Sequence, residues 1–513
     1  MAEMSAQNPL LETILKQAKL HPQKQAIEGK SYSLSYAELV EQVRDVADWL
    51  DQYEQEVVGL LLENGPAWVV IDLAAQMAGK VVVPLPHFFS DEQLKHVIKD
   101  ASVGLLFTDN PARLEGFASS LFEFNEVISK PSLIQSESIS LCQNLSLMGR
   151  NSELSDVGKI TYTSGTTGSP KGVCLSNDAI FEVAEALKAR TEASEDDCHL
   201  CLTPLSTLLE NSAGIYVPLL SGGKVVVLPS TEVGLQGASG LDVKKLLSAL
   251  SDYQASSAIL IPQMLLAMVT AIEMGLPRPD RLRFLAVGGA PVSESLLERA
   301  AACGLPIFQG YGLSECGSVV AVNSPVENRV GSVGKPLPHL QVRFSDEGEI
   351  LVKGSLFKGY LGSSDIEREV FWPTGDIGYQ DEAGYLWVTG RKKSLFITSY
   401  GRNVSPEWLE SEFSTHPAIQ QIVVFGEGRA WNCAVIVSQL LATVAGRSEI
   451  DRIIEIINAR LPDYARIKRW LPAKAPFSLD NGQWTGTARP RRVQLFEAYQ
   501  DEIEQLYFRE ELK

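Results

Sequence analysis

The sequence contains few cysteines, no long uninterrupted apolar run and no excess of basic residues. Its seven cysteines are an odd number, scattered along 513 residues, which favours free thiols in a reducing compartment over a disulfide framework. No run of about 18 uncharged apolar residues is present, so we expect no membrane-spanning helix. Acidic residues outnumber basic ones by 63 to 45, and the net charge of −18 argues against nucleic acid or an anionic membrane as a general partner.

The beginning of the chain also lacks the basic region and apolar core of a secretory signal. We therefore expect a soluble, cytoplasmic protein, and peripheral contact with a membrane is compatible with the sequence. A length of 513 residues predicts more than one domain, because single cores rarely grow beyond roughly 250–300 residues. Hydrophobic residues make up 45% of the chain, which is enough to fill several buried cores.

Short apolar strands alternate with helical patterns over the first part of the chain. The ranges 57–62, 81–86 and 103–107 are apolar throughout, and helical patterns at 68–77 and 91–100 separate them. Such near-continuous apolar strands are typical of parallel sheets that helices cover on both faces. Three further strands are predicted at 224–228, 257–261 and 282–287.

The pattern changes near residue 337 to short alternating strands and glycine turns, which predict a small antiparallel or barrel-like subdomain. Beyond Gly390-Arg391 the signals are those of an α+β unit, with helices expected at 406–413 and 449–461. We therefore expect an α/β protein with a large amino-terminal domain of mostly parallel, helix-covered sheets, residues 1–390, and a small mobile carboxyl-terminal domain, residues 391–513.

The stretch from Ile160 to Val173 carries the strongest functional signal. Between short apolar runs it contains three glycines, Lys171 and the hydroxyl side chains of Thr161, Thr163, Ser164, Thr166 and Thr167. Glycines let backbone N–H groups converge on an anion, and the hydroxyls and the lysine add donors and positive charge. The loop therefore suits a polyphosphate. It is not a Walker A loop, because Lys171 has the wrong spacing and no Ser or Thr follows it.

Further blocks follow strands in the same way. Gly288-Gly289-Ala290 continues an apolar strand, Tyr311-Gly312-Leu313-Ser314-Glu315 continues another, and Asp376 stands in a segment that we interpret as a tight turn. Each block alone is as typical of an ordinary turn or helix cap as of a ligand site. In this order, however, they resemble the adenylate-forming superfamily of acyl-CoA synthetases, peptide-synthetase adenylation domains and luciferases, with long-chain fatty acyl-CoA synthetases as the most similar branch.

The resemblance implies a role for each block. Tyr311 would stack on adenine, Ser314 would contact the α-phosphate, and Asp376 would accept the ribose hydroxyls. Lys171, Glu315 and Arg489 would be catalytic, Glu315 and Thr166 would contact Mg²⁺, and Lys393 would be the hinge of the carboxyl-terminal domain. The nucleotide contacts that it implies are Thr163, Ser164, Gly165, Thr166, Thr167, Gly168, Gly288, Gly289, Ala290, Tyr311, Gly312, Ser314, Asp376 and Arg391.

Two segments depart from the family pattern. Arg489 stands where the family has a lysine that bridges the carboxylate and the α-phosphate, and its planar fork differs from a compact ammonium group. In Pro204–Asn211, Thr207 replaces a histidine or aromatic residue that shields the acyl pocket, and Asn211 replaces an arginine. Cys198-His199-Leu200-Cys201 invites a zinc interpretation, but no second ligand pair is spaced suitably, and we expect a buried strand.

We therefore expect an AMP-forming acid–thiol ligase that uses ATP, Mg²⁺ and CoA and acts on a small carboxylic acid, most simply a fatty acid in lipid metabolism. Three alternatives stay open. The enzyme could load acyl-AMP onto an acyl carrier protein, the chain could be a nucleotide-binding homologue that Arg489 has impaired, or it could be a phosphate-releasing NTPase. The NTPase would yield ADP where a ligase yields AMP.

Overall fold

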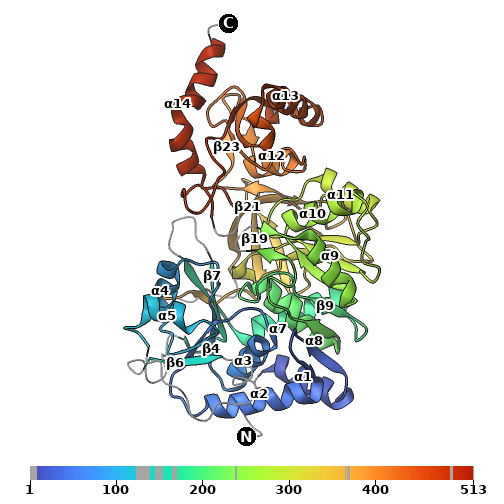
Figure 1. Ribbon diagram of the computed structural model, residues 1–513, viewed down its shortest axis with the longest axis vertical. Helices are drawn as coiled ribbons and strands as arrows, with labels where there is room; N and C mark the ends of the chain where they lie inside the picture. Colours follow the sequence, from blue (N-terminus) through green and yellow to red (C-terminus); the bar gives the residue numbers. More distant parts are fainter. Residues whose placement is uncertain are drawn as a thin grey trace.

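The computed structural model describes residues 8–122, 139–144, 154–163, 170–236, 240–363, 366, 370–485 and 489–511. Their elements form a large amino-terminal part and a smaller carboxyl-terminal part, which lies at the opposite end of the molecule from the amino terminus (Figure 1). The expected α/β architecture with a large and a small domain is therefore confirmed, whereas a boundary at residues 390 and 391 stays a prediction.

The first sheet carries the glycine-rich loop and is parallel at its centre. Its order is β20-β8-β7-β4-β3-β5-β6, and β3 pairs in parallel with both β4 and β5. These central strands are buried along their whole length, as their continuous apolar sequences predict. The strands are β3 (Val57–Leu61), β4 (Val81–Pro84), β5 (Leu105–Thr108), β6 (Ser140–Gln143), β7 (Lys159–Thr163), β8 (Lys171–Leu175) and β20 (Gly359–Tyr360).

The second sheet has the order β17-β16-β15-β14-β13-β9-β10-β1-β2. Its inner pairs from β1 to β15 run parallel, so the carboxyl ends of β13, β14 and β15 meet at one edge. The strands are β1 (Gln25–Glu28), β2 (Ser33–Ser35), β9 (Cys198–Leu200), β10 (Lys224–Val226), β13 (Ser257–Leu260), β14 (Phe284–Val287), β15 (Ile307–Tyr311), β16 (Ala321–Val322) and β17 (Lys335–Pro336). A separate ribbon joins β11 (Leu235–Gln236) and β12 (Gly240–Leu241).

Helices between the two sheets share one hydrophobic core with both of them. Capping boxes begin α2 and α4, with Ser35 and Ser90 as the N-caps. The helices of this part are α1 (Pro9–Leu20), α2 (Tyr36–Leu50), α3 (Pro66–Met77), α4 (Asp91–Asp100), α5 (Pro111–Ala118), α7 (Asn177–Arg190), the π-helix η3 (Glu210–Tyr216), α8 (Val217–Ser221), α9 (Val243–Asp252), α10 (Pro262–Glu273), α11 (Glu294–Ala302) and the 3₁₀ turn η4 (Ser314–Cys316).

A four-stranded antiparallel sheet leads toward the carboxyl-terminal part, as the alternating pattern after residue 337 predicts. Its order is β18-β19-β21-β22, and its inner face packs on the loop after β15 through Cys316 and Val320. The strands are β18 (Leu340–Phe344), β19 (Glu349–Gly354), β21 (Trp372–Gln380) and β22 (Leu386–Arg391).

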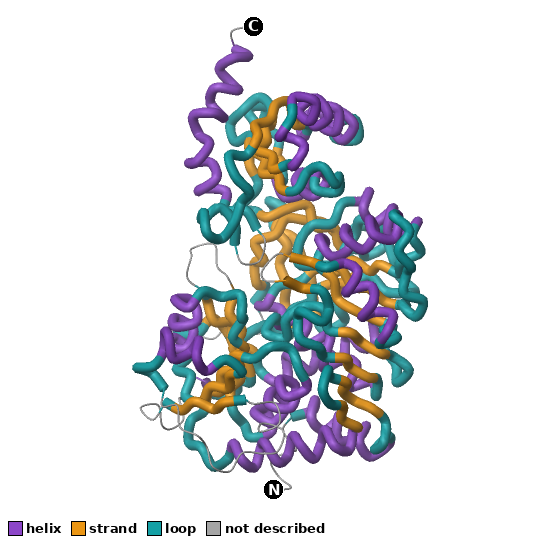
Figure 2. The backbone as a smooth tube through the Cα atoms, in the orientation of Figure 1, coloured by secondary structure: helices purple, strands orange, loops and turns teal. Residues whose placement is uncertain are grey.

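The carboxyl-terminal part packs two cores on the two faces of a three-stranded sheet, and α14 extends along its outer side (Figure 2). The helix expected at 449–461 begins earlier, at Val444, because Thr443 caps it through the Gly446 N–H. The elements are β23 (Phe396–Ile397), β24 (Asn403–Val404), α12 (Pro406–Phe413), β25 (Gln421–Phe425), β26 (Asn432–Val437), η5 (Gln439–Ala442), α13 (Val444–Asn458), η6 (Asp463–Ala465), β27 (Ile467–Pro472) and α14 (Arg492–Glu511). Within the described ranges, no helix is both long and apolar enough to cross a membrane.

A fully buried ion pair links the first sheet to helix α3 and to the π-helix η3. Lys159, the first residue of β7, donates to Asp72 Oδ1 of α3 over 2.8 Å and to the Tyr216 hydroxyl over 2.8 Å. It also donates to the Asn211 side chain of the π-helix. Burial lowers the pKa of Lys159, and the Asp72 charge opposes that shift. The resembled branch has an arginine at the position of Asn211. In this protein, Asn211 instead contacts a cation from another element, Lys159 of β7.

Substitution Lys159→Met should lower the free energy of unfolding by about 3–5 kcal/mol, because it leaves the Asp72 carboxylate buried without its counter-charge. Urea denaturation of the purified protein measures the change. The double variant Lys159→Met/Asp72→Leu should recover much of the loss. Lys188→Met, which breaks a partly exposed i,i+3 pair with Glu185, is the matched control and should change stability by less than about 1 kcal/mol. A loss of less than about 1 kcal/mol in Lys159→Met alone would contradict this role of the buried ion pair.

Candidate active site

The glycine-rich stretch connects two antiparallel strands, β7 and β8, which pair Thr163 with Lys171. Ser164, Gly165, Thr166, Thr167 and Gly168 lie outside the described residues. Two side chains of α4 contact the chain before and after the loop. The Tyr162 hydroxyl donates to Asp100 Oδ2 over 2.6 Å, and His96 Nε2 lies 3.2 Å from the Pro170 carbonyl oxygen.

Lys171 and Glu315 both contact one aromatic side chain, Tyr360 of β20. The Tyr360 hydroxyl donates to Glu315 Oε1 over 2.7 Å, and Lys171 Nζ lies 5.4 Å from the centroid of the Tyr360 ring. Because β20 pairs with β8, a segment far along the chain brings the lysine of the loop and the carboxylate after β15 to the same place.

The turns at the carboxyl ends of β14 and β15 lie side by side. Ligands of open α/β sheets bind at such edges. Gly288 lies so close to Gly310 that an added Cβ would stand 3.1 Å from its carbonyl oxygen, and Gly289 has a φ of +81°. A Cβ at Gly312 would stand 1.8 Å from the Ser318 carbonyl oxygen, so this position admits glycine alone. Ala290 is exposed in the first turn, and Ser314 begins the 3₁₀ turn after the second.

Asp376 lies in strand β21 and not in a tight turn, so the predicted conformation is wrong. The antiparallel register of β21 and β22 places Asp376 opposite Arg391, which explains why fifteen residues separate them in sequence. Arg391 Nε lies 2.8 Å from Asp376 Oδ1, and the Tyr311 hydroxyl donates to Asp376 Oδ2 over 2.6 Å. The carboxylate is 3% exposed.

Burial and neighbouring charged groups shift the pKa of Asp376. Burial raises the pKa of Asp376 above its ordinary value, and Arg391, the Tyr311 hydroxyl and Arg489 oppose the rise. The negative charge of Glu315 adds to it. Asp376 is therefore within electrostatic range of both Glu315 and Arg489, and Glu315 in turn shares Tyr360 with Lys171. These four residues come from four separate stretches of the sequence.

Arg489 reaches this place from the carboxyl-terminal part. Its Nη2 donates to the Gly289 carbonyl oxygen over 2.8 Å. The following residues are anchored on α12, where Arg492 forms a two-pronged ion pair with Glu410 at 2.7 and 3.0 Å. Lys393 is exposed two residues after the end of β22. The loop that carries Arg489 is therefore fixed at its carboxyl end, and its side chain spans the gap to the amino-terminal part.

Two of these residues escaped the sequence analysis. Tyr360 stands in a two-residue strand flanked by glycine, a pattern too short to signal a role. Lys159 left a clearer signal, because a lysine at the start of an otherwise buried strand needs a partner.

The cysteine cluster is a buried strand, as expected. Cys198 and Cys201 belong to different hydrophobic cores, so they do not form a ligand pair. In the described part of the chain, His199, Cys201 and Glu210 do gather within 4.8 Å of one another. The Glu210 carboxylate already accepts from the Thr203 N–H at 3.0 Å and lies 3.0 Å from His199 Nε2.

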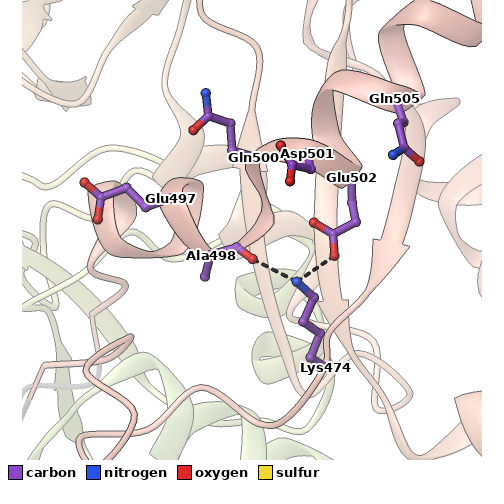
Figure 3. A pocket seen from close by; sticks show the side chains of 7 residues that line it. All are labelled: Lys474, Glu497, Ala498, Gln500, Asp501, Glu502 and Gln505. Carbon is purple, nitrogen blue, oxygen red and sulfur yellow. Dashed lines mark hydrogen bonds and ion pairs between the residues drawn. The ribbon is translucent and has the colours of Figure 1, made fainter.

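A surface groove beside α14 lies in the carboxyl-terminal part, and Figure 3 shows the residues that line it. Lys474 Nζ crosses it, donating to the Ala498 carbonyl oxygen over 2.9 Å and pairing with Glu502 at 2.6 Å. Its other lining residues are Glu497, Gln500, Asp501 and Gln505. None of the residues expected to act on a nucleotide lines this groove.

Comparison with known proteins identifies relatives along nearly the whole chain. The model of the AMP-binding enzyme family matches residues 14–361, and that of the AMP-binding enzyme C-terminal domain matches residues 393–511. The long-chain-fatty-acid–CoA ligase FadD15 of Mycobacterium bovis is 26% identical, with 86% of each chain covered. The 2-succinylbenzoate–CoA ligase of Bacillus cereus is 29% identical, over 90% of this chain and 94% of that protein.

Among solved structures, the anthranilate CoA ligase AuaEII in complex with anthranoyl-AMP matches with a TM-score of 0.79, over 96% of this chain and 97% of that one, at 19% identity. This likeness concerns the fold. The expected enzyme class, an AMP-forming acid–thiol ligase, is confirmed by the family match and by the relatives. The chain therefore belongs to the AMP-binding enzyme family, within the adenylate-forming superfamily that its motifs resemble.

Proposed function

We propose that the protein activates a fatty acid with ATP and transfers the acyl group to CoA. The acid's carboxylate attacks the α-phosphorus of ATP, pyrophosphate leaves with the electron pair of the broken bond, and the CoA thiol then displaces AMP from the acyl-AMP. The observation that carries the proposal is the convergence of Lys171, Glu315 and Asp376 with Arg489 around one edge of the second sheet.

The first step requires that the reactants be positioned and that developing negative charge be stabilised. It does not require a nucleophile from the protein. Charge develops on the phosphoryl oxygens as the bond to pyrophosphate lengthens, and fixed cations lower the energy of that state. We assign this task to Lys171 on the pyrophosphate side and to Arg489 on the side of the incoming carboxylate. The Gly289 carbonyl that Arg489 contacts at 2.8 Å would release the guanidinium to the bound acid.

Asp376 and Arg391, which pair across strands β21 and β22, would hold the nucleoside. Asp376 has both carboxylate oxygens engaged, by Arg391 and Tyr311, and two ribose hydroxyls can take up the remaining lone pairs. Tyr311 would lie under the adenine, beside the backbone of Gly288, Gly289 and Ala290. Arg391 would contact the ribose or the α-phosphate.

A magnesium ion fits the donor set. Glu315 supplies a carboxylate at the place where phosphates would lie, and Mg²⁺ prefers one or two carboxylates together with phosphate oxygens. Bound there, the ion would neutralise charge on the phosphates. Thr166, the second expected ligand, stays a prediction outside the described residues.

The proposed substrate rests on the Pro204–Asn211 segment, whose Leu205, Ser206 and Glu210 keep the frame of the fatty-acyl branch, and on the match to a long-chain fatty acid ligase. Because 2-succinylbenzoate ligases match as well, an acid screen must include both classes. The screen measures pyrophosphate release with fatty acids of increasing length, 2-succinylbenzoate and anthranilate, and identifies the nucleotide and acyl products by mass. We expect AMP and a fatty acyl-CoA.

Product analysis separates the alternatives. Acyl transfer to a holo-carrier protein but not to CoA would identify a carrier-loading ligase. Nucleotide binding without pyrophosphate exchange for any acid would indicate an impaired homologue. Release of ADP in place of AMP would contradict the proposal outright.

Substitution Asp376→Ala should weaken ATP binding about 10- to 100-fold, because hydrogen bonds to a charged group contribute roughly 1.5–3 kcal/mol. Isothermal titration calorimetry measures the affinity, and thermal unfolding of the free protein checks that the sheet is intact. Glu382→Ala, an exposed carboxylate in the adjoining β-turn, is the control. ATP affinity equal to that of the native protein would remove Asp376 from the ribose site.

Substitution Arg489→Lys should keep or raise the rate of acid-dependent ATP–pyrophosphate exchange, because lysine restores the compact donor for which the family site is shaped. Arg491→Lys, two residues along on an exposed side chain, should leave the rate unchanged. A loss of more than about tenfold in Arg489→Lys alone would mean that the guanidinium fork is part of this enzyme's mechanism.

Substitution Lys393→Pro should spare the exchange reaction and suppress thioester formation, since a fixed φ restricts rotation at the hinge. The two half-reactions are measured separately, as pyrophosphate exchange and as acyl-CoA release from preformed acyl-AMP. Lys393→Ala keeps the rotation free and serves as the control. Equal losses in both half-reactions would count against a hinge at this position.

A further inference from the structure

Tyr360 lies outside every motif recognised above, yet it contacts two of them. Its hydroxyl donates to Glu315 Oε1 over 2.7 Å, and its ring faces Lys171 Nζ at 5.4 Å from the centroid. An aromatic ring attracts a cation at this distance. The same side chain therefore touches the carboxylate expected to meet Mg²⁺ and the lysine expected to meet the phosphates.

The backbone around Tyr360 also contacts the segments that carry Glu315 and Lys171. The Phe357 N–H donates to the Glu315 carbonyl oxygen over 2.8 Å, and the Leu361 N–H donates to the Gly172 carbonyl oxygen over 2.8 Å. The segment 357–361 thus holds the main chain of the 3₁₀ turn at one end and that of β8 at the other. Tyr360 stands between the two anchors, so its position relative to Glu315 and Lys171 is set by hydrogen bonds on both sides.

The orientation of the ring is also fixed. Phe357 packs edge-on against Tyr360 with centroids 5.1 Å apart, and Trp372 packs against both, at 4.9 Å from Phe357 and 6.3 Å from Tyr360. Phe357 is 2% exposed. A ring held in this way cannot swing aside without disturbing a buried aromatic cluster, so its hydroxyl keeps one direction, toward Glu315.

We propose that Tyr360 is a positioning residue for the magnesium site: its hydroxyl sets the orientation of the Glu315 carboxylate, and its ring keeps Lys171 on the phosphate side. The inference rests on the proposed function and deepens it. A hydrogen bond to one carboxylate oxygen fixes the plane of the group, and outer contacts of this kind typically change metal affinity by about 10- to 100-fold.

Calorimetry tests the proposal without any turnover. ATP affinity is measured with Mg²⁺ and with EDTA, and the ratio of the two affinities is the magnesium coupling. Tyr360→Phe keeps the ring and removes the hydroxyl, so the coupling should fall about 10- to 100-fold while metal-free ATP affinity changes little. Tyr360→Leu also removes the ring, and it should weaken metal-free ATP binding as well because Lys171 loses its support.

Tyr379→Phe is the matched control, since this tyrosine is 51% exposed and stacks on Trp387; it should keep the native coupling. In a Glu315→Gln background, Tyr360→Phe should have no further effect on coupling. Native coupling in Tyr360→Phe, or an equal loss in the Glu315→Gln background, would overturn the proposal. A protein that binds Mg·ATP with native coupling but exchanges no pyrophosphate would contradict the ligase function and leave this test valid.

Discussion

The cross-strand pair of Asp376 and Arg391 is the contact on which the arrangement of the site depends. It holds a buried carboxylate at the end of a four-stranded sheet, where the Tyr311 hydroxyl from the second large sheet meets it. Three structural units, the second sheet, the four-stranded sheet and the carboxyl-terminal loop with Arg489, come within electrostatic range of one another there. Because the carboxylate is buried with its partners in place, the site is organised before any ligand binds, and preorganised charge is what transfer at phosphorus requires.

The carboxyl-terminal part contributes an anchor, Arg492, and a side chain that contacts the amino-terminal part, Arg489. The ion pair of Arg492 with Glu410 holds the end of the loop on α12, three residues from Arg489. The Arg489 guanidinium contacts the Gly289 carbonyl oxygen of the amino-terminal part. We propose that Arg489 takes the place of the family's lysine, although its planar fork differs from a compact ammonium group.

The sequence predicted the fold class and most strands because continuous apolar runs are local signals, as the fully buried β3 and β4 illustrate. It also singled out Gly288–Ala290 and Tyr311–Glu315, since each continues an apolar strand into a segment that contains glycine. What it could not supply were contacts that depend on tertiary pairing. The strand conformation of Asp376 follows from its register with β22, and the role of Tyr360 follows from β20 joining β8 from far along the chain. Asn211 departs visibly from the family pattern, but its contact with Lys159 depends on the packing of the π-helix against β7.

We propose that one magnesium nucleotide touches Lys171, Glu315, Asp376 and Arg489 together. A crystal structure of the protein with Mg·ATP tests this most directly. We expect the ribose on Asp376, the metal on Glu315, the terminal phosphates beside Lys171, and Arg489 near the α-phosphate. A nucleotide bound with its ribose away from Asp376, or a metal held without Glu315, would contradict it.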